Sequence, residues 1–186
     1  MPTATPHAGC YKKTTNRPIM HRLLLIVLLL LPGIATCQPD KVYRSLTEVT
    51  NPEEVYILHL RGKRLKAVPQ QVYAMHNLRE LNLRSNRIAT LSDSIVLLQN
   101  LARIELSRTP IDSLPPVMAS LPHLRQLVLW DTRVTVLPKE FARLDDTLQL
   151  LDLRDCPLTL DDQKAIEQLL PTVKKLWDYA CNCPTD

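Results

Sequence analysis

Apolar residues return along this chain with a period of 23 residues. Each copy places apolar side chains at the same seven positions, and the clearest copies begin at Leu78, Leu101 and Leu124. A weaker copy begins at Val55 and a divergent one at Leu148. In the copy that begins at Leu78 these positions hold Leu78, Leu81, Leu83, Ile88, Leu91, Ile95 and Leu98. Copies in register over this length predict a solenoid, in which each unit buries its apolar face only by stacking on the next.

Each copy opens with the alternation that is typical of a strand. In Leu78-Arg-Glu-Leu81-Asn-Leu83 the fourth and sixth positions are apolar and their neighbours are polar. A half-buried strand requires this pattern because successive side chains point to opposite faces. The rest of each copy carries apolar residues at helical or irregular spacing, which predicts the convex side of the solenoid.

The ninth position of each copy turns the chain out of the strand. Asn86 occupies it in the second copy, where its amide can hydrogen-bond the backbone of the turn. Thr109, Thr132 and Cys156 are small enough to lie inside the turn. Lys63 is not, so we expect the first coil to be exposed at this point.

These units resemble the bacterial leucine-rich repeat of about 23 residues, L-x-x-L-x-L-x-x-N-x-L-x-x-L-P, from residue 55 to about 172. The Leu-Pro step appears as Val68-Pro69, Leu114-Pro115 and Leu137-Pro138, and the second copy departs from it with Leu91-Ser92. The resemblance implies an α/β fold: a short curved solenoid with a parallel sheet and an irregular or helical convex side. It also implies protein–protein recognition as the general use of the fold. We call the solvent-facing side of the predicted sheet the concave face.

The ends of a solenoid expose core and need caps. Apolar residues three and four apart in residues 43–50 predict one short amphipathic helix before Asn51-Pro52. Thr159-Leu-Asp-Asp162 predicts the start of a helix that Pro171 ends. Residues 173–177 predict a last edge strand. The inner face of the second helix is predicted to hold Ala165, Ile166, Leu169 and Leu170.

The N-terminus has the pattern of a secretory signal. Met20-His21-Arg22 precedes the nine-residue apolar run Leu23–Leu31, and small residues follow before Cys37. The run is shorter than the roughly 20 residues that span a bilayer. Ile34-Ala35-Thr36-Cys37 resembles a lipoprotein signal, which implies that Cys37 is lipidated and becomes the first mature residue. Thr36 departs from the usual residue there, so cleavage near Ala35 and release as a secreted protein is the alternative.

The predicted organisation follows from these segments. Residues 1–36 are a leader that is removed, and residues 37–54 hold the lipid-anchor spacer and an N-terminal capping helix. Residues 55–158 are the repeats, and residues 159–186 are the C-terminal cap. Whether translation begins at Met1 or Met20 stays open.

The charge balance excludes one class of partner. The chain has 23 Lys and Arg, 19 Asp and Glu and a net charge of +4. Four of the basic residues and none of the acidic ones precede Cys37, so 19 of each remain after the leader. A neutral mature domain, with no basic-aromatic array, does not predict nucleic-acid binding.

Three cysteines remain besides Cys37 in the mature chain. Cys156 falls at a turn, where a small buried side chain is the simplest interpretation. A lone Cys181-Asn-Cys183 is weak evidence for metal or redox chemistry. A structural role in the cap is the favoured alternative, and the pairing of these three thiols stays open.

The strand positions that do not serve the core point out on the concave face. One predicted column runs His59, Asn82, Glu105, Val128 and Asp152, and the next runs Arg61, Arg84, Ser107, Trp130 and Arg154. A third runs Ile57, Glu80, Arg103, Gln126 and Leu150. Tryptophan and arginine are enriched where interfaces are strongest. The residues predicted to bind a partner are Arg61, Arg84, Glu105, Trp130, Asp152 and Arg154.

Catalysis is not predicted. His59 has no serine or cysteine nucleophile placed to form a relay, and the chain has neither a phosphate-binding glycine loop nor a clustered metal-ligand pattern. We therefore predict no cofactor, no catalytic residue and no metal site. The leading hypothesis is a protein-binding module tethered by Cys37 to a bacterial envelope membrane, with a protein or peptide as partner. A structural or adhesive envelope component, and a freely secreted effector, are the alternatives.

Overall fold

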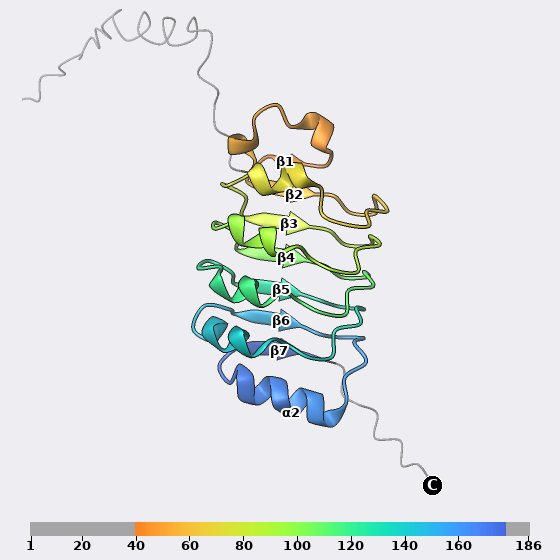
Figure 1. Ribbon diagram of the computed structural model, residues 1–186, viewed down its shortest axis with the longest axis vertical. Coiled ribbons are helices and arrows are strands. Elements are labelled where there is room, and N and C mark those ends of the chain that lie inside the picture. Colours follow the sequence, from red (N-terminus) through yellow and green to blue (C-terminus); the bar gives the residue numbers. More distant parts are fainter. Residues whose placement is uncertain (1–39, 178–186) are drawn as a thin grey trace, which may run out of the picture. The chain divides into compact units, whose positions relative to one another are not determined.

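The computed structural model describes residues 40–177. The predicted leader, Cys37, Cys181 and Cys183 lie outside the described residues. Seven parallel strands form one sheet in which each strand lies beside its neighbour in the sequence (Figure 1). They are β1 (Val42–Tyr43), β2 (Ile57–His59), β3 (Glu80–Asn82), β4 (Arg103–Glu105), β5 (Gln126–Val128), β6 (Leu150–Asp152) and β7 (Lys174–Leu176). The sheet is open and uncurled over this length, so its solvent-facing side is a broad floor.

The register of the sheet reproduces the sequence period. Ile57, Glu80, Arg103 and Gln126 pair in line from β2 to β5, each 23 residues after the last. Gln126 then pairs with Leu150, which is 24 residues on. The periodic leucines must stay on the buried side of every strand, since a one-residue slip would turn them to solvent. The extra residue is therefore taken up between β5 and β6, outside the paired strands.

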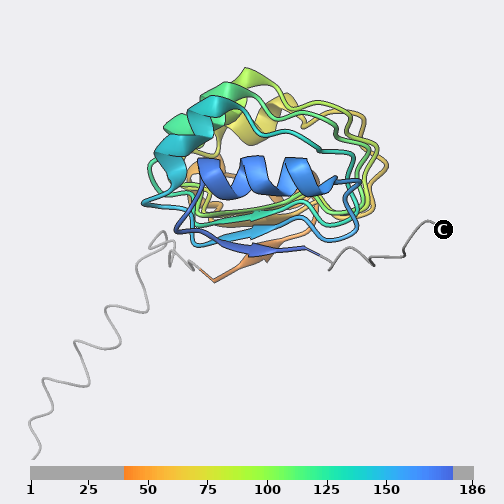
Figure 2. The same ribbon diagram turned by 90° about the horizontal axis from the view of Figure 1, so that it is seen from below.

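The core lies between the sheet and a row of 3-10 helices on the other side (Figure 2). Leu81, Ile104 and Leu127 at the centre of successive strands are fully buried and stack on one another. The helices that cover them are η3 (Gln70–Ala74), η4 (Asp93–Leu97), η5 (Pro116–Ser120) and η6 (Lys139–Leu144). The convex side is thus helical, as predicted.

The Leu-Pro step has a local cause. Pro69, Pro115 and Pro138 each stand immediately before a 3-10 helix, with φ of −60°, −68° and −56°. The proline ring fixes φ near the value that this position needs. Ser92 replaces proline in the second copy and accepts a hydrogen bond from the backbone N–H of Ser94, so a side-chain cap substitutes for the ring.

The ninth-position residue of the second copy, Asn86, lies inside its turn. The amide nitrogen of Asn86 donates to the carbonyls of Leu60 (2.9 Å) and Leu83 (2.6 Å), and its oxygen accepts from the N–H of Leu65 (3.0 Å). Asn86 thereby links two consecutive repeats, as the sequence predicted. Lys63 is exposed, which confirms the expectation of an exposed first coil.

The N-terminal cap differs from the single helix predicted for residues 43–50. Tyr43 belongs to β1 and pairs with Leu58 in β2. The rest folds into η1 (Leu46–Glu48) and η2 (Pro52–Glu54), capped by the side chains of Ser45 and Asn51. The prediction was wrong because β2 would otherwise leave its backbone groups and Leu58 at an open sheet edge, and pairing with β1 satisfies both.

The C-terminal cap is largely as predicted. Helix α2 (Leu160–Leu169) begins with a reciprocal capping box between Thr159 and Asp162. Ile166 and Leu170 are buried against the last repeat, whereas Ala165, predicted to face inward, is exposed. Strand β7 follows as the predicted edge strand. No helix in residues 40–177 is long and apolar enough to span a membrane.

Candidate functional site

The structure places the predicted columns together on the concave face. Strand pairing aligns His59 with Asn82, Asn82 with Glu105, and Glu105 with Val128. Backbone hydrogen bonds between consecutive turns align the column that holds Arg61, Arg84, Ser107, Trp130 and Arg154. All six predicted partner-binding residues therefore lie on one side of the sheet, in columns one or two positions apart.

The two predicted carboxylates are not presented to solvent. Glu105 is 6% exposed and Asp152 is 4% exposed. The guanidinium of Arg103 donates to Glu105 Oε2 at 2.8 Å, and Arg154 donates twice to Asp152, at 2.9 and 2.7 Å. Buried carboxylates need such paired donors. Arg103 and Arg154 are therefore more exposed than the carboxylates they contact, and Glu105 and Asp152 fix the positions of their guanidinium groups.

Trp130 is the centre of the site. The guanidinium carbon of Arg84 lies 4.7 Å from the centre of the indole ring, and that of Arg108 lies 4.6 Å from it. The indole N–H donates to Asp155 Oδ2 at 2.5 Å. We call Arg84, Arg108, Trp130 and Asp155 the Trp130 platform. Each cation–π contact contributes roughly 0.5–2 kcal/mol, depending on how far it is desolvated.

Ser107 explains how Arg84 reaches Trp130. The two residues lie two strands apart, a separation of roughly 10 Å between their backbones. Ser107 stands between them in the same column and is completely buried. Because its side chain is small, Arg84 and Trp130 can lean over it and meet.

Arg108 and Asp155 are functional candidates that the sequence analysis missed. Each follows a residue of the Trp130 column and has a positive φ, of 56° and 55°. Gly62, Ser85 and Asp131 occupy the same left-handed position in other copies. Aspartate tolerates this conformation better than most residues. Small or acidic residues recur directly after the Trp130 column, as Gly62, Ser85, Asp131 and Asp155. This recurrence is the sequence signal of the left-handed turn position.

The other two arginines of the column differ from Arg84. Arg61 is exposed and forms no ion pair with any described residue. Arg154 is the bidentate partner of Asp152. Arg84 has its Nε–H buried with no hydrogen-bond acceptor among residues 40–177. The column therefore offers two guanidinium groups, Arg61 and Arg84, without carboxylate partners.

His59 has a structural partner. Its Nε2 lies 2.8 Å from Oε1 of Glu80, in the neighbouring strand and column. The same carboxylate oxygen lies 3.9 Å from Arg103 Nε. No cluster of three or more His, Cys, Asp or Glu that could hold a metal ion occurs within residues 40–177. The arrangement is a network of polar contacts across strands, in which the hydroxyl of Ser107 also donates to Glu105 Oε1 at 2.5 Å.

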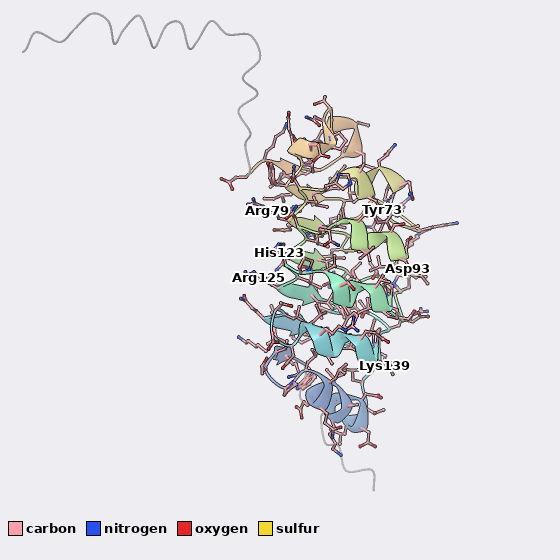
Figure 3. The ribbon with its side chains drawn as sticks, turned by 60° about the vertical axis from the view of Figure 1, so that its left-hand side comes forward. Tyr73, Arg79, Asp93, His123, Arg125 and Lys139 are labelled. Carbon is pink, nitrogen blue, oxygen red and sulfur yellow. The ribbon has the colours of Figure 1, made fainter. Side chains whose placement is uncertain are left out.

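A second cluster of arginines borders a shallow hollow of about 620 Å³ at the edge of the sheet where the strands begin. Arg79 and Arg125 line it, and both are exposed. Figure 3 shows them on one side of the stack, away from Tyr73 and Lys139. Neither was predicted, because both stand one residue before the strand, in a column that the alternation of the strand does not mark.

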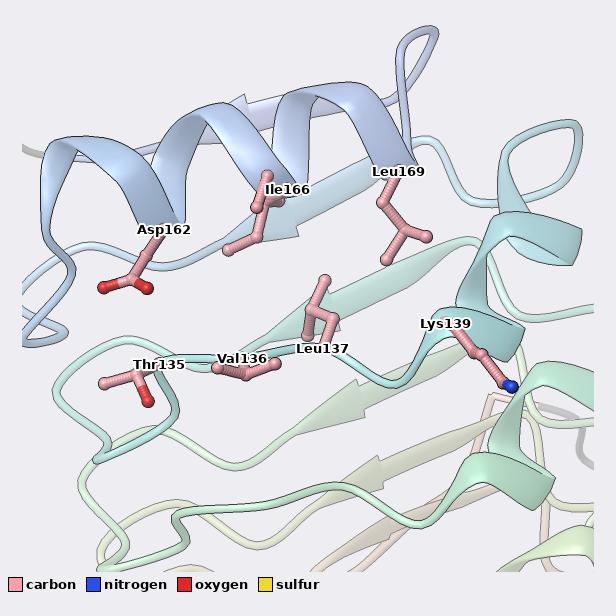
Figure 4. A pocket seen from close by; sticks show the side chains of 8 residues that line it. Thr135, Val136, Leu137, Lys139, Asp162, Ile166 and Leu169 are labelled. Atoms are coloured by element: carbon pink, nitrogen blue, oxygen red, sulfur yellow. The ribbon is translucent and has the colours of Figure 1, made fainter.

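A smaller groove of about 210 Å³ lies between α2 and the convex segment of the preceding repeat (Figure 4). Val136, Leu137, Ile166 and Leu169 give it apolar walls. Val136 is 66% exposed, and Leu160 at the start of α2 is 55% exposed. Val136, Leu160 and Leu97 are the large apolar side chains that are exposed within residues 40–177.

Comparison with known proteins supports the fold. The leucine rich repeat family model matches residues 53–111. The search of curated proteins gave no match. A leucine-rich-repeat protein of Leptospira interrogans matches with 21% identity and a TM-score of 0.47, over 75% of this chain and 48% of that one. An internalin from Listeria monocytogenes matches with 18% identity and a TM-score of 0.50, over 67% of this chain and 40% of that one.

A plant structure matches as well. The leucine-rich-repeat ectodomain of the Arabidopsis thaliana receptor kinase GASSHO1/SCHENGEN3, in complex with CASPARIAN STRIP INTEGRITY FACTOR 2, is 19% identical with a TM-score of 0.52. The match covers 73% of this chain and 17% of that one. The chain spans less than half the length of each of the three structures. The family match, the seven-stranded parallel sheet and the likeness to the internalin and the plant ectodomain together confirm the predicted leucine-rich-repeat solenoid.

Proposed function

We propose that this leucine-rich-repeat solenoid is a non-catalytic protein-binding module whose partner binds across the concave face. The observation that carries the proposal is the Trp130 platform, an indole held in one orientation on an open sheet. Arg84 and Arg108 contact the ring, and Asp155 accepts its N–H. Tryptophan and arginine dominate the strongest contacts of protein interfaces. A side chain that is already fixed loses little entropy when a partner arrives.

The dimensions of the face support a protein or peptide partner. Seven strands about 4.8 Å apart make a floor roughly 29 Å long. A standard interface buries about 800 Å² on each partner, and a floor of this length with its two rims of turns has that order of area. The Trp130 platform lies inside this floor, on the turn after β5, and β6 and β7 follow it. Strong contacts are usually surrounded by other contacts that exclude water.

Arg84 gives a second line of support. Its buried Nε–H has no acceptor among the described residues. An unpaired buried donor costs about 1–3 kcal/mol, which offsets the stabilisation that Arg84 gains from its contact with Trp130. A role for its guanidinium group in binding accounts for the residue better than a role in the fold.

The test is cross-linked capture from the native envelope, with the wild-type chain compared with Arg84→Ala/Trp130→Ala. A matched control, Arg87→Ala/Leu97→Ala, removes an exposed arginine and an exposed apolar residue away from the concave face. Circular dichroism must first show all three proteins folded at the capture temperature. We expect a partner with wild type and control and its loss with the platform variant. Equal capture by all three proteins would refute the concave-face assignment.

The proposal includes a membrane tether at Cys37. The support is the sequence alone: a charged start, a short apolar run and small residues before the cysteine. Val42 begins the first strand, so a tether of about four residues would separate the lipid from the fold. That short tether would keep the solenoid close to the membrane surface of a bacterial envelope.

Lateral association is the second candidate, and the groove beside α2 favours it. Val136 is an exposed apolar residue that lines this groove (Figure 4), and Leu160 is an exposed apolar residue at the start of α2. A structural or adhesive role through this surface predicts oligomers that grow with concentration. Analytical ultracentrifugation of wild type and Val136→Ser/Leu160→Ser would show such oligomers in the wild type only. A wild-type monomer at all concentrations would exclude this candidate.

A further inference from the structure

The hollow where the strands begin has a regular construction. Backbone hydrogen bonds of 2.8 Å join the residue before each strand to the residue before the next, from Tyr56 to Gln149. The resulting pre-strand column is Tyr56, Arg79, Ala102, Arg125 and Gln149. Two arginines therefore stand on either side of an alanine, and their backbones lie roughly 10 Å apart. Ala102 leaves the space between them open, which produces the hollow of about 620 Å³.

The guanidinium groups of the two arginines in this column are available as hydrogen-bond donors. Arg79 lies over the ring of Tyr56, with its guanidinium carbon 5.1 Å from the ring centre. Neither Arg79 nor Arg125 forms an ion pair with any residue in the described range. Both side chains are exposed. Each guanidinium carries five N–H donors in a planar fork that fits a carboxylate.

Two other charged residues of the hollow, Arg103 and Glu80, already contact residues of the sheet. Arg103 donates to Gln126 Oε1 at 2.5 Å and to Glu105 Oε2 at 2.8 Å. Nε2 of His59 lies 2.8 Å from Oε1 of Glu80. Arg103 and one carboxylate oxygen of Glu80 are thus held within the sheet, while Arg79 and Arg125 are exposed.

We propose that this hollow binds the carboxylate of an aspartate or glutamate side chain in an acidic segment of the partner protein. The proposal rests on the function proposed above and names the chemistry that its partner must carry. Ile57 and Gln126 also line the hollow, as do the carboxylates of Glu80 and Asp40. The apolar and amide groups suit a peptide, and the two carboxylates disfavour a continuous run of phosphates more than a single carboxylate held between the two arginines. The observations therefore favour a protein segment over a phosphate polymer or a lipid surface.

The geometry also sets a spacing in the partner. Arg125 and Trp130 lie in the same repeat, five residues apart along an extended stretch. At about 3.3 Å per residue this separates the hollow from the Trp130 platform by roughly 16 Å. An extended peptide lying along the strand direction spans that distance in about five residues. The partner segment thus carries an acidic residue about five positions from an apolar one.

The experiment is selection of random twelve-residue peptides displayed on phage, with the immobilised full chain as bait. Selected peptides are then synthesised and titrated against wild type, Arg79→Ser/Arg125→Ser, and the matched control Arg87→Ser/Arg143→Ser. Arg87 and Arg143 are exposed and lie away from the concave face. We expect selected sequences to be enriched in Asp or Glu about five positions from an apolar residue. Their binding should weaken at least about tenfold in the hollow variant and stay unchanged in the control.

Two results would overturn the assignment, and each is distinct from failure of the proposed function. Peptides without acidic enrichment that still depend on Arg84 and Trp130 would refute the hollow and leave the protein-binding face standing. Vesicles of phosphatidylglycerol that bind through Arg79 and Arg125, when acidic peptides do not, would replace the peptide with a membrane surface. Selected peptides that bind independently of all four residues would refute both proposals.

Discussion

Replacement of Asn86 by alanine tests the link between the sequence period and the stability of the stack. Asn86 is 5% exposed and its side chain forms three hydrogen bonds of 3.0 Å or less, to Leu60, Leu83 and Leu65. Alanine leaves two carbonyls and one N–H without these partners at the junction of two repeats. Each unsatisfied buried group costs about 1–3 kcal/mol. Because the two carbonyls can relax in part, we expect a total loss of roughly 3–5 kcal/mol.

That loss is a large fraction of the 5–15 kcal/mol that stabilises a typical domain. Urea denaturation followed by circular dichroism measures it, with Asn82→Ala as the control. Asn82 is half-buried on the concave face, and its side chain bonds only the N–H of Arg84, at 3.1 Å. We expect the control to lose about 1 kcal/mol or less. Asn86→Asp keeps the acceptor for Leu65 and removes both donors, so it should also be strongly destabilised at neutral pH. Equal losses for Asn86→Ala and Asn82→Ala would refute the reasoning.

Three further predictions follow from other parts of the chain. Burial raises the pKa of the Cys156 thiol, so at pH 8 mass spectrometry should find it alkylated more slowly in the folded protein than in urea; equal rates would contradict its burial. The hydroxyl and backbone N–H of Thr159 lower the pKa of Asp162 below its usual value of 3.8. The stabilisation from this carboxylate is therefore present above that value and lost as the pH falls through the lower folded pKa; Asp162→Asn should melt below wild type at pH 6, and the gap should close in acid. Cys37→Ser should move the protein from the membrane to the soluble fraction, and an unchanged distribution would refute the lipid tether.

The sequence predicts the repeat register because one physical constraint acts in every copy. Leu81, Ile104 and Leu127 must all be buried, and the alternation around them leaves one choice of strand and face. The capping box of α2 is local too, since Thr159 and Asp162 are three residues apart and satisfy each other. Such local patterns can be interpreted from the sequence alone, because they do not depend on contacts between distant segments.

The features that the sequence did not predict depend on contacts between segments. The apolar residues of 43–50 have helical spacing, yet Tyr43 pairs with Leu58 in β2. Strand pairing at the sheet edge satisfies backbone groups of β2 that a helix in this segment would leave unpaired. The partners of Trp130 come from three repeats and depend on the small Ser107 that separates it from Arg84. The burial of Glu105 could not be read from its position in the pattern. It depends on where the guanidinium of Arg103 lies.

The most direct test of binding through the concave face is site-specific photo-cross-linking in the cells that produce the protein. A photoreactive phenylalanine analogue at Asn82 probes the concave face, and the same analogue at the exposed Leu97 probes the convex side. We expect a protein adduct from position 82 and none from position 97. An adduct from position 97 alone, or none from position 82, would contradict binding through the concave face.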